Sequence, residues 1–196
     1  MELLDEKKII EEAKKNPEVF GLLYDKFYKP IFNYILRRTS DIKDAQDLTS
    51  QTFFKALKGL GKFHWQNISF SAWLYRIATN EVNDFYRKKG DIIRVSIDKV
   101  PEIPAPETVD SDFEMAEKEL KSKEEFIKLH RNIQKLAPIY QTVIVLRFFE
   151  KKKISEICQI INKPEGTIKS QIHRALEKLK KAMEQENMQP FSKETL

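Results

Sequence analysis

Apolar residues in the first 90 positions recur every three or four residues, the spacing of an α-helix that buries one face. The longest of these stripes predicts a helix that starts near Phe20 and is interrupted at Asp41. Its apolar positions are Phe20, Leu23, Phe27, Ile31 and Ile35. A shorter helix is predicted before it, ending near Asn16, because the residue before a proline disfavours helical backbone.

Two further helices are predicted in the same half of the chain. One extends to Gly59 and Gly61, and glycine is common just after a helix end. Its apolar stripe is Ala45, Leu48, Thr52, Phe53, Ala56 and Leu57. The other runs from Phe70 to about Lys89, where Gly90 stops it. Its apolar positions are Phe70, Trp73, Leu74, Ile77, Val82 and Phe85.

The second half of the chain has a helical pattern as well. The predicted helices run from about Glu125 to Leu136, from Pro138 through Phe148, from Ile154 to Ile161 and from Glu165 to Glu186. Glycine contributes only 5 of 196 residues, which disfavours a turn-rich β fold. The predicted fold class is therefore all-α.

Between the two halves lies a segment that favours extended backbone. Pro101, Pro104 and Pro106 fall close together in the acidic stretch 91–112, and residues 113–125 read as the acidic beginning of a helix. We expect two small helical domains, 1–90 and 126–185, joined by a flexible acidic Pro-containing linker, 91–125. Residues 186–196 are expected to form a tail.

Charge and composition narrow the functional classes. Lys and Arg number 35 against 30 Asp and Glu, a net charge of +5, and the acidic linker separates two basic segments. Basic segments favour polyanions, of which nucleic acid is the commonest. The one cysteine, Cys158, excludes an internal disulfide framework. The longest apolar runs, such as 143–146, are far too short for membrane insertion, so a cytoplasmic protein is expected.

The strongest local motif surrounds Asn162, between two predicted helices. Asn tolerates the left-handed backbone that the turn of a helix-turn-helix needs, and Pro164 and Glu165 suit the start of the next helix. The small Cys158 fits where the two helices cross. Polar and basic side chains then suit base and phosphate contacts in a major groove. They are Thr167, Lys169, Ser170, Gln171, His173 and Arg174, opposite a predicted buried face of Ile168, Ile172, Ala175, Leu176 and Leu179. The alternative is an amphipathic hairpin with a solvated polar face.

A second polar stripe follows one face of the predicted helix from Phe70 to Lys89. Its members are Arg76, Asn80, Asn83, Asp84 and Arg87, and the preceding loop carries His64, Trp65 and Asn67. Amide and basic groups beside aromatic rings suit unstacked bases, because rings stack and amides read base edges. The alternative is that Trp65 and Phe70 are core residues.

The predicted helix 44–57 exposes a different chemistry. Its outward residues are Asp44, Gln46, Asp47, Ser50, Gln51 and Phe54. An acidic edge with one exposed aromatic ring on a basic domain fits a protein-binding surface better than a DNA surface. An ordinary solvated face is the alternative.

Catalytic motifs are missing from the sequence. It has no His-Glu-x-x-His, no Walker loop and no Gly-x-Gly-x-x-Gly, and its three histidines, His64, His130 and His173, lie far apart. We therefore expect no enzyme, no cofactor and no metal site.

Three stretches, in this order, resemble a bacterial RNA polymerase sigma factor of the extracytoplasmic-function (ECF, group IV) type. They are DAQDLTSQTF at 44–53, FSAWLYRIATN at 70–80, and GTIKSQIHRAL at 166–176 preceded by LRFFE at 146–150. The resemblance covers residues 16–90 and 126–183. It implies a promoter-specificity subunit without catalysis of its own, which recognises the −35 and −10 elements and promotes DNA opening.

The resemblance also implies site residues and partners. Contacts with the clamp helices of core RNA polymerase would fall on Asp44, Asp47, Leu48, Gln51 and Phe54. Contacts with the −10 element would fall on His64, Trp65, Asn67, Arg76, Asn80, Asp84 and Arg87. Contacts with the −35 element would fall on Thr167, Lys169, Ser170, Gln171, His173 and Arg174. The helices of 126–150 would help to hold the polymerase flap, and an anti-sigma factor is a further expected partner.

This chain also departs from the family pattern. The family usually has a glycine and a serine cap before the helix-turn-helix, where this chain has Lys151 and Lys153, and Ser155 is the nearest replacement cap. A competing interpretation is a stand-alone helix-turn-helix transcriptional regulator whose N-terminal module binds another protein. A third, a nucleic-acid enzyme, predicts metal-dependent activity.

Overall fold

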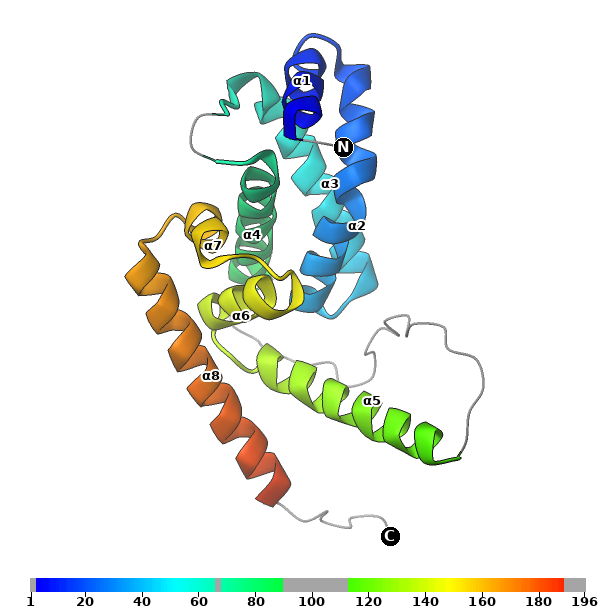
Figure 1. Ribbon diagram of the computed structural model, residues 1–196, viewed down its shortest axis with the longest axis vertical. Helices are drawn as coiled ribbons and strands as arrows, with labels where there is room; N and C mark the ends of the chain where they lie inside the picture. Colours follow the sequence, from blue (N-terminus) through cyan, green and yellow to red (C-terminus); the bar gives the residue numbers. More distant parts are fainter. Residues whose placement is uncertain (1–2, 66–67, 90–112, 189–196) are drawn as a thin grey trace.

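The computed structural model describes residues 3–65, 68–89 and 113–188, and their regular structure is helical throughout (Figure 1). The N-terminal helices are α1 (Leu3–Ala13), α2 (Phe20–Thr39), α3 (Ile42–Gly59) and α4 (Phe70–Lys89). The C-terminal helices are α5 (Phe113–Gln134), α6 (Pro138–Ile144), α7 (Ile154–Ile161) and α8 (Glu165–Met188). The predicted all-α class is confirmed. Asn67, the stretch 91–112 and the end of the predicted tail lie outside the described residues.

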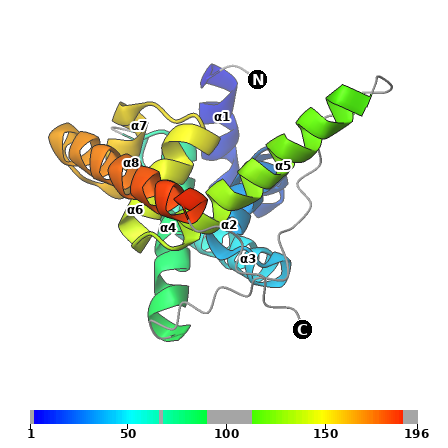
Figure 2. The same ribbon diagram turned by 90° about the horizontal axis from the view of Figure 1, so that it is seen from below.

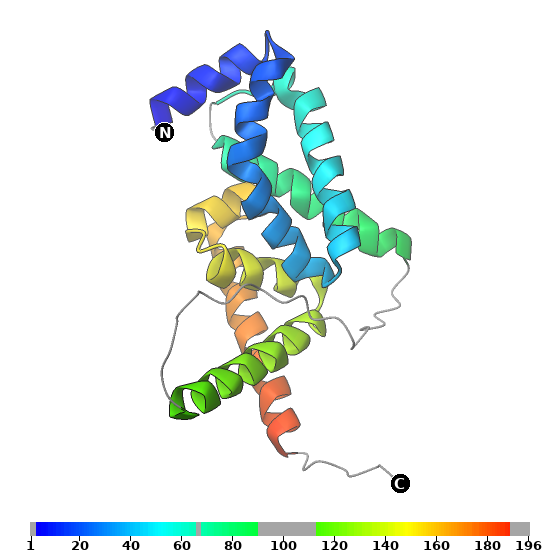
Figure 3. The same ribbon diagram turned by 90° about the vertical axis from the view of Figure 1, so that its right-hand side faces the viewer.

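The helices α2 and α3 lie side by side and run in opposite directions, and α4 crosses them (Figure 3). The reversal between α2 and α3 is tight. Ser40 ends α2 in a left-handed conformation, with φ of 56°. The carboxylate of Asp41 then caps α3 by accepting a hydrogen bond from the Asp44 N–H at 2.9 Å. Asp41 thus begins a new helix where the sequence analysis predicted only an interruption.

The core of the N-terminal domain follows the predicted stripes closely. All five positions on α2, from Phe20 to Ile35, are buried, as are five of the six on α3. The exception is Leu57, which is 39% exposed, so that prediction is wrong. Two threonines in the α3 core, Thr49 and Thr52, satisfy their hydroxyls by donating to the carbonyls of Ala45 and Leu48.

An aromatic cluster fixes the start of α4. The Ser69 hydroxyl accepts a hydrogen bond from the Ala72 N–H at 3.1 Å, which caps the helix. The Phe70 ring is fully buried, with its centroid 5.6 Å from that of Phe63 and 5.5 Å from that of Trp73. This packing orients both α4 and the loop before it.

The C-terminal domain is built on α6 and α8, with α5 crossing α8 (Figures 2 and 3). At the crossing, the Asn132 amide donates to a carboxylate oxygen of Glu186 at 2.6 Å. The helix α5 begins at Phe113, which agrees with the prediction that residues 113–125 form the acidic beginning of a helix. The first turns of α5 therefore fall within residues 91–125, which were predicted as the linker.

The connection between α6 and α7 is unusual. A π-helical turn, Val145–Phe149, continues α6, and Lys151 then adopts a left-handed conformation with φ of 52°. Ser155 does not begin α7. The helix starts one residue earlier, and the Lys153 N–H donates to the carboxylate of Glu156 at 2.8 Å. The prediction of a Ser155 cap is therefore wrong.

We expect the variant Lys151→Gly to raise the free energy of unfolding by about 1 kcal/mol, because left-handed backbone costs a residue with a Cβ roughly 1–2 kcal/mol. Lys151 is exposed, so its side chain gives up little contact. Urea unfolding measures the change. The matched control is Lys153→Gly, since Lys153 has an ordinary φ of −68° and gains nothing from glycine. A Lys151→Gly protein no more stable than the wild type would contradict this explanation.

A buried histidine makes stability depend on pH. Burial lowers the pKa of His130 below its ordinary value, the charge of Arg37 acts in the same direction, and a hydrogen bond to the Arg37 backbone opposes both. Because the unfolded chain takes up this proton at higher pH than the folded chain, stability falls as pH drops through about 6.5. We expect His130→Gln to flatten that fall in urea unfolding at pH 7.5 and 5. An equally steep fall in His130→Gln would contradict this explanation.

Candidate nucleic-acid interface

The two helices around Asn162 form a helix-turn-helix. Asn162 ends α7 with φ of 57° and ψ of 53°, the left-handed turn that the sequence predicted. Cys158 is partly buried at the crossing of α7 and α8, and its carbonyl accepts from the backbone N–H groups of Asn162 and Lys163. Pro164 precedes α8 and does not open it, because the helix begins at Glu165.

The exposed face of α8 carries half of the predicted readout residues. Lys169, His173 and Arg174 are exposed, whereas Thr167, Ser170 and Gln171 are half-buried. The side-chain oxygen of Gln171 is buried without a hydrogen-bond partner in the described part of the chain. Of the predicted buried face, Leu176 is 41% exposed, so that prediction is wrong.

Two exposed ion pairs occupy this face. The Glu165 carboxylate lies 2.6 Å from Lys169 Nζ and raises the pKa of that amine, chiefly through their hydrogen bond. His173 Nε2 lies 3.6 Å from a carboxylate oxygen of Glu177, a pair that is ionic only when the histidine is protonated. Exposed pairs of this kind are weak, so a phosphate group can displace the carboxylate.

One part of the polar stripe on α4 is exposed to solvent, and another part contacts α7. Asn80, Asn83 and Arg87 are exposed, and Arg87 makes an ion pair of 3.0 Å with the half-buried Asp84. Arg76, by contrast, donates from Nε at 3.1 Å to the backbone oxygen of Gln159 in α7, and its Nη2 donates to the same oxygen.

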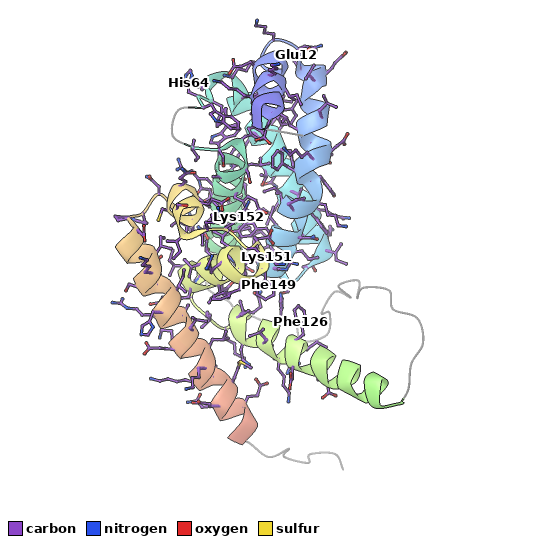
Figure 4. All side chains as sticks on the ribbon, viewed as in Figure 1. Glu12, His64, Phe126, Phe149, Lys151 and Lys152 are labelled. Carbon is purple, nitrogen blue, oxygen red and sulfur yellow. The ribbon has the colours of Figure 1, made fainter. Side chains whose placement is uncertain are left out.

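The loop before α4 holds one exposed and one sheltered ring. His64 is exposed, and Figure 4 shows it near α1 at the upper end of the domain. Trp65 is half-buried, and its ring meets that of Phe63 edge-on at 6.2 Å between centroids. Phe70 is a core residue, which confirms the alternative for that ring. Trp65 retains part of its surface.

The outer face of α3 has the predicted acidic and aromatic character. Asp47, Gln51 and Phe54 are exposed, and Asp44 is half-buried. Phe54 is 57% exposed, with the Lys58 amine 4.3 Å from its ring centroid. Leu48 is 4% exposed and packs in the core, so its side chain supports the helix from inside and offers a partner almost no surface.

A group of polar contacts between the two domains was not predicted from the sequence. A carboxylate oxygen of Glu150 accepts from Arg37 Nη1 at 2.8 Å, and its other oxygen accepts from the Tyr75 hydroxyl at 2.7 Å. The fully buried Arg38 donates to the Thr142 hydroxyl at 2.6 Å. Basic residues are common in the last turn of a helix, where they complement the helix dipole, so Arg37 and Arg38 did not stand out in the sequence as contacts between domains.

Within residues 3–65, 68–89 and 113–188, no three His, Cys, Asp or Glu side chains come together as a metal site would require. Among the helices described, none has the length and apolar character to cross a membrane.

Two family models match the chain, one for each domain. Sigma-70 region 2 matches residues 23–92, which include α3, α4 and all but the first three residues of α2. Sigma-70 region 4 matches residues 126–179, which include the helix-turn-helix.

Curated relatives share most of the chain. The ECF RNA polymerase sigma factor SigW of Bacillus subtilis is 30% identical over 185 residues, covering 93% of this chain and 98% of that protein. The RNA polymerase sigma factor YlaC of the same organism is 32% identical, covering 82% of this chain and 90% of its own.

Solved structures share the fold. CnrH in complex with the cytosolic domain of CnrY has a TM-score of 0.65 at 20% identity, covering 90% of this chain and 95% of that one. The sigma factor RpoE in complex with the anti-sigma factor NepR from Bartonella quintana has a TM-score of 0.61 at 20% identity, covering 84% and 96%.

Proposed function

This chain belongs to the ECF family of RNA polymerase sigma factors, which direct the polymerase to promoters, and from that premise we propose how its surfaces divide the work. The C-terminal domain recognises the −35 element, the N-terminal domain recognises and opens the −10 element, and α3 binds the polymerase. The observation that carries this division is chemical. The basic readout face, the amide-rich stripe and the acidic face lie on three different helices.

At the −35 element, α8 enters the major groove. Lys169, His173 and Arg174 are exposed near the start of a helix that follows a left-handed turn, which is where recognition helices carry their base contacts. Arg can read guanine through two hydrogen bonds. Thr167, Ser170 and Gln171 are half-buried and fit the edge of the contact.

At the −10 element, α4 and the loop before it bind unpaired bases. Asn80 offers an amide for base edges, Arg87 offers charge to the backbone, and His64 and Trp65 offer rings for stacking. A base that leaves the stack loses pairing and stacking energy, which such contacts replace. Asp84 orients Arg87, and Asn67 and Arg76 complete the proposed set.

The polymerase contact is the outer face of α3. Asp44, Asp47 and Gln51 provide charge and hydrogen bonds, and Phe54 provides an exposed ring of the kind that anchors protein interfaces. Because Leu48 is buried, we assign it the role of holding α3 in place. The region 126–150 contacts the polymerase flap.

An anti-sigma factor is a further partner of this chain. Its support is the fold, since RpoE, which has the same architecture, was solved with the anti-sigma factor NepR. The chain itself has no catalysis to perform, because a sigma factor lends specificity to the polymerase.

The test is transcription by core RNA polymerase from a randomised promoter library, with and without this protein. Transcripts that need both the protein and sequences near −35 and −10 would support the proposal and give the promoter. Specific binding of duplex DNA without polymerase, and no new transcripts, would favour the stand-alone helix-turn-helix regulator.

A further inference from the structure

The helix-turn-helix domain covers part of the helix proposed to read the −10 element. Figure 1 shows α7 beside α4, and the two helices are in contact. The Arg76 guanidinium donates twice to the backbone oxygen of Gln159, in the last turn of α7. The C-terminal end of a helix carries partial negative charge, so α7 binds this guanidinium as a phosphate or base oxygen would. One proposed DNA contact is therefore occupied by the protein itself.

The preceding turn of α4 is covered as well. The Lys152 amine donates to the Ser71 hydroxyl at 3.1 Å and lies 4.6 Å from the centroid of the Tyr75 ring. Tyr75 is 2% exposed, and burial, together with the charge of Glu150, raises the pKa of its hydroxyl. Figure 4 places Lys152 and Lys151 in the middle of the molecule, between the two domains. The helix-turn-helix domain thus covers part of α4 from Ser71 to Arg76, where Tyr75 is buried and Ser71 and Arg76 are half-buried.

Glu150 is the centre of this closed arrangement. Its two carboxylate oxygens accept from Arg37 on α2 and from Tyr75 on α4, and its side chain is 8% exposed. The residue follows the π-helical turn directly, so it joins the helix-turn-helix domain to two helices of the other domain. A buried carboxylate with two donors holds a geometry strongly, and removing the carboxylate leaves both donors unsatisfied.

A neighbouring contact limits how firmly the domains hold together. Arg38 is fully buried, and its side-chain donors meet Tyr34, Gln141 and Thr142, which are all neutral. Its Nη2 has no partner among the described residues. A buried cation that faces neutral groups loses hydration energy, which it regains when the domains separate. When the domains separate, the hydration of Arg38 therefore offsets part of the energy lost with the contacts between them.

The closed arrangement cannot read both promoter elements on straight DNA. Elements centred about 25 base pairs apart are separated by about 85 Å, since B-DNA rises about 3.4 Å per base pair. Arg76 touches Gln159, and the six residues from there to the start of α8 can span at most about 22 Å. The two reading helices must move apart before the protein engages a promoter.

We propose that this sigma factor is self-closing, with Glu150 as a latch that docks the helix-turn-helix domain on α4 and masks Arg76 until the polymerase separates the domains. The masking rests on the −10 assignment above, whereas the latch rests on geometry alone. The experiment therefore measures the two separately.

The latch is tested by the distance between spin labels at Glu12→Cys and Lys181→Cys, both exposed, in a full-length Cys158→Ala background. We expect one narrow distribution in the free protein and longer distances with core RNA polymerase. Glu150→Arg should lengthen and broaden the distribution without polymerase. Arg37→Glu should do the same, and the double variant, which restores an ion pair, should close again. Tyr75→Phe, which removes one hydrogen bond, should open the protein partly.

The control is Glu177→Arg, which makes the same charge change on exposed α8 and should leave the distances unchanged. A broad distribution in the wild-type protein, or an unaltered one in Glu150→Arg and Tyr75→Phe together, would overturn the latch. Thermal unfolding followed by circular dichroism establishes that each variant is folded.

The masking is tested by binding of the free protein to a single-stranded oligonucleotide that carries the −10 element found in the library experiment. We expect Glu150→Arg to bind about tenfold more tightly than the wild type, and Arg76→Ala to abolish that gain. Opened distances without tighter binding would overturn the masking and the role of Arg76, and would leave the latch standing.

Discussion

Core RNA polymerase should bind the Asp47→Arg variant about 100-fold more weakly than the wild type, a loss of about 3 kcal/mol, which is the size of a central interface residue. Asp47 is exposed on α3, one turn from the exposed Gln51 and two turns from Phe54. An acidic patch selects a basic partner surface, so the reversal removes an attraction and adds a repulsion at the same place. Titration of labelled protein with core polymerase measures the affinity.

A matched variant separates this effect from a general change of charge. Glu12→Arg alters the net charge equally and lies on α1, at the upper end of the same domain in Figure 4. It should bind polymerase within about twofold of the wild type, because an exposed charge away from the interface acts weakly through screening salt. Equal losses in the two variants, or no loss in Asp47→Arg, would remove Asp47 from the polymerase contact.

Helical periodicity predicted most of the core because it is a local property. The five apolar positions of α2 recur on one face, and every one of them is buried. Period alone does not say how far the neighbouring helix extends. Leu57 and Leu176 continue their stripes in the sequence, but each is exposed, at 39% and 41%. The sequence therefore predicts which face of each helix is apolar, but not how much of that face a neighbouring helix covers.

The readout surface was predictable to a similar degree. Asn162 has the left-handed backbone that its residue type suggested, and Lys169, His173 and Arg174 are exposed. The same segment suggested Ser170 as an equal member, and that side chain is half-buried. Residue chemistry identified the helix, and packing against the rest of the domain decided which side chains remain accessible.

The contacts between the domains were beyond the sequence. Glu150 lies 113 residues from Arg37 and 75 from Tyr75, so neither period nor local motif relates them. The left-handed backbone of Lys151 was not predictable either, because a glycine is the usual sequence signal for that conformation and this chain has a lysine. The Glu150 contacts depend on tertiary packing, which brings the residue after the π-helical turn against α2 and α4.

Arg174→Ala should cost about 2 kcal/mol in recognition of the −35 element, roughly a 30-fold loss, within the range for a side chain that contacts base edges. Arg174 is exposed on α8, nine residues beyond the helix start at Glu165. Its loss should be specific for sequence, because base contacts discriminate among sequences whereas phosphate contacts position the protein on any sequence. Holoenzyme binding is measured on two promoters that differ only in an intact or a scrambled −35 element.

The control is Lys181→Ala, which removes the same charge two turns further along the same exposed face of α8. That variant should weaken binding to both promoters by a similar small factor, because a contact to the phosphate backbone carries no sequence information. Arg174→Ala should weaken the intact promoter alone, and so reduce the ratio between the two promoters. An equal loss on both would make Arg174 a phosphate contact, and the specificity for the −35 element would then fall to Lys169 and His173, the other two exposed side chains of the readout face.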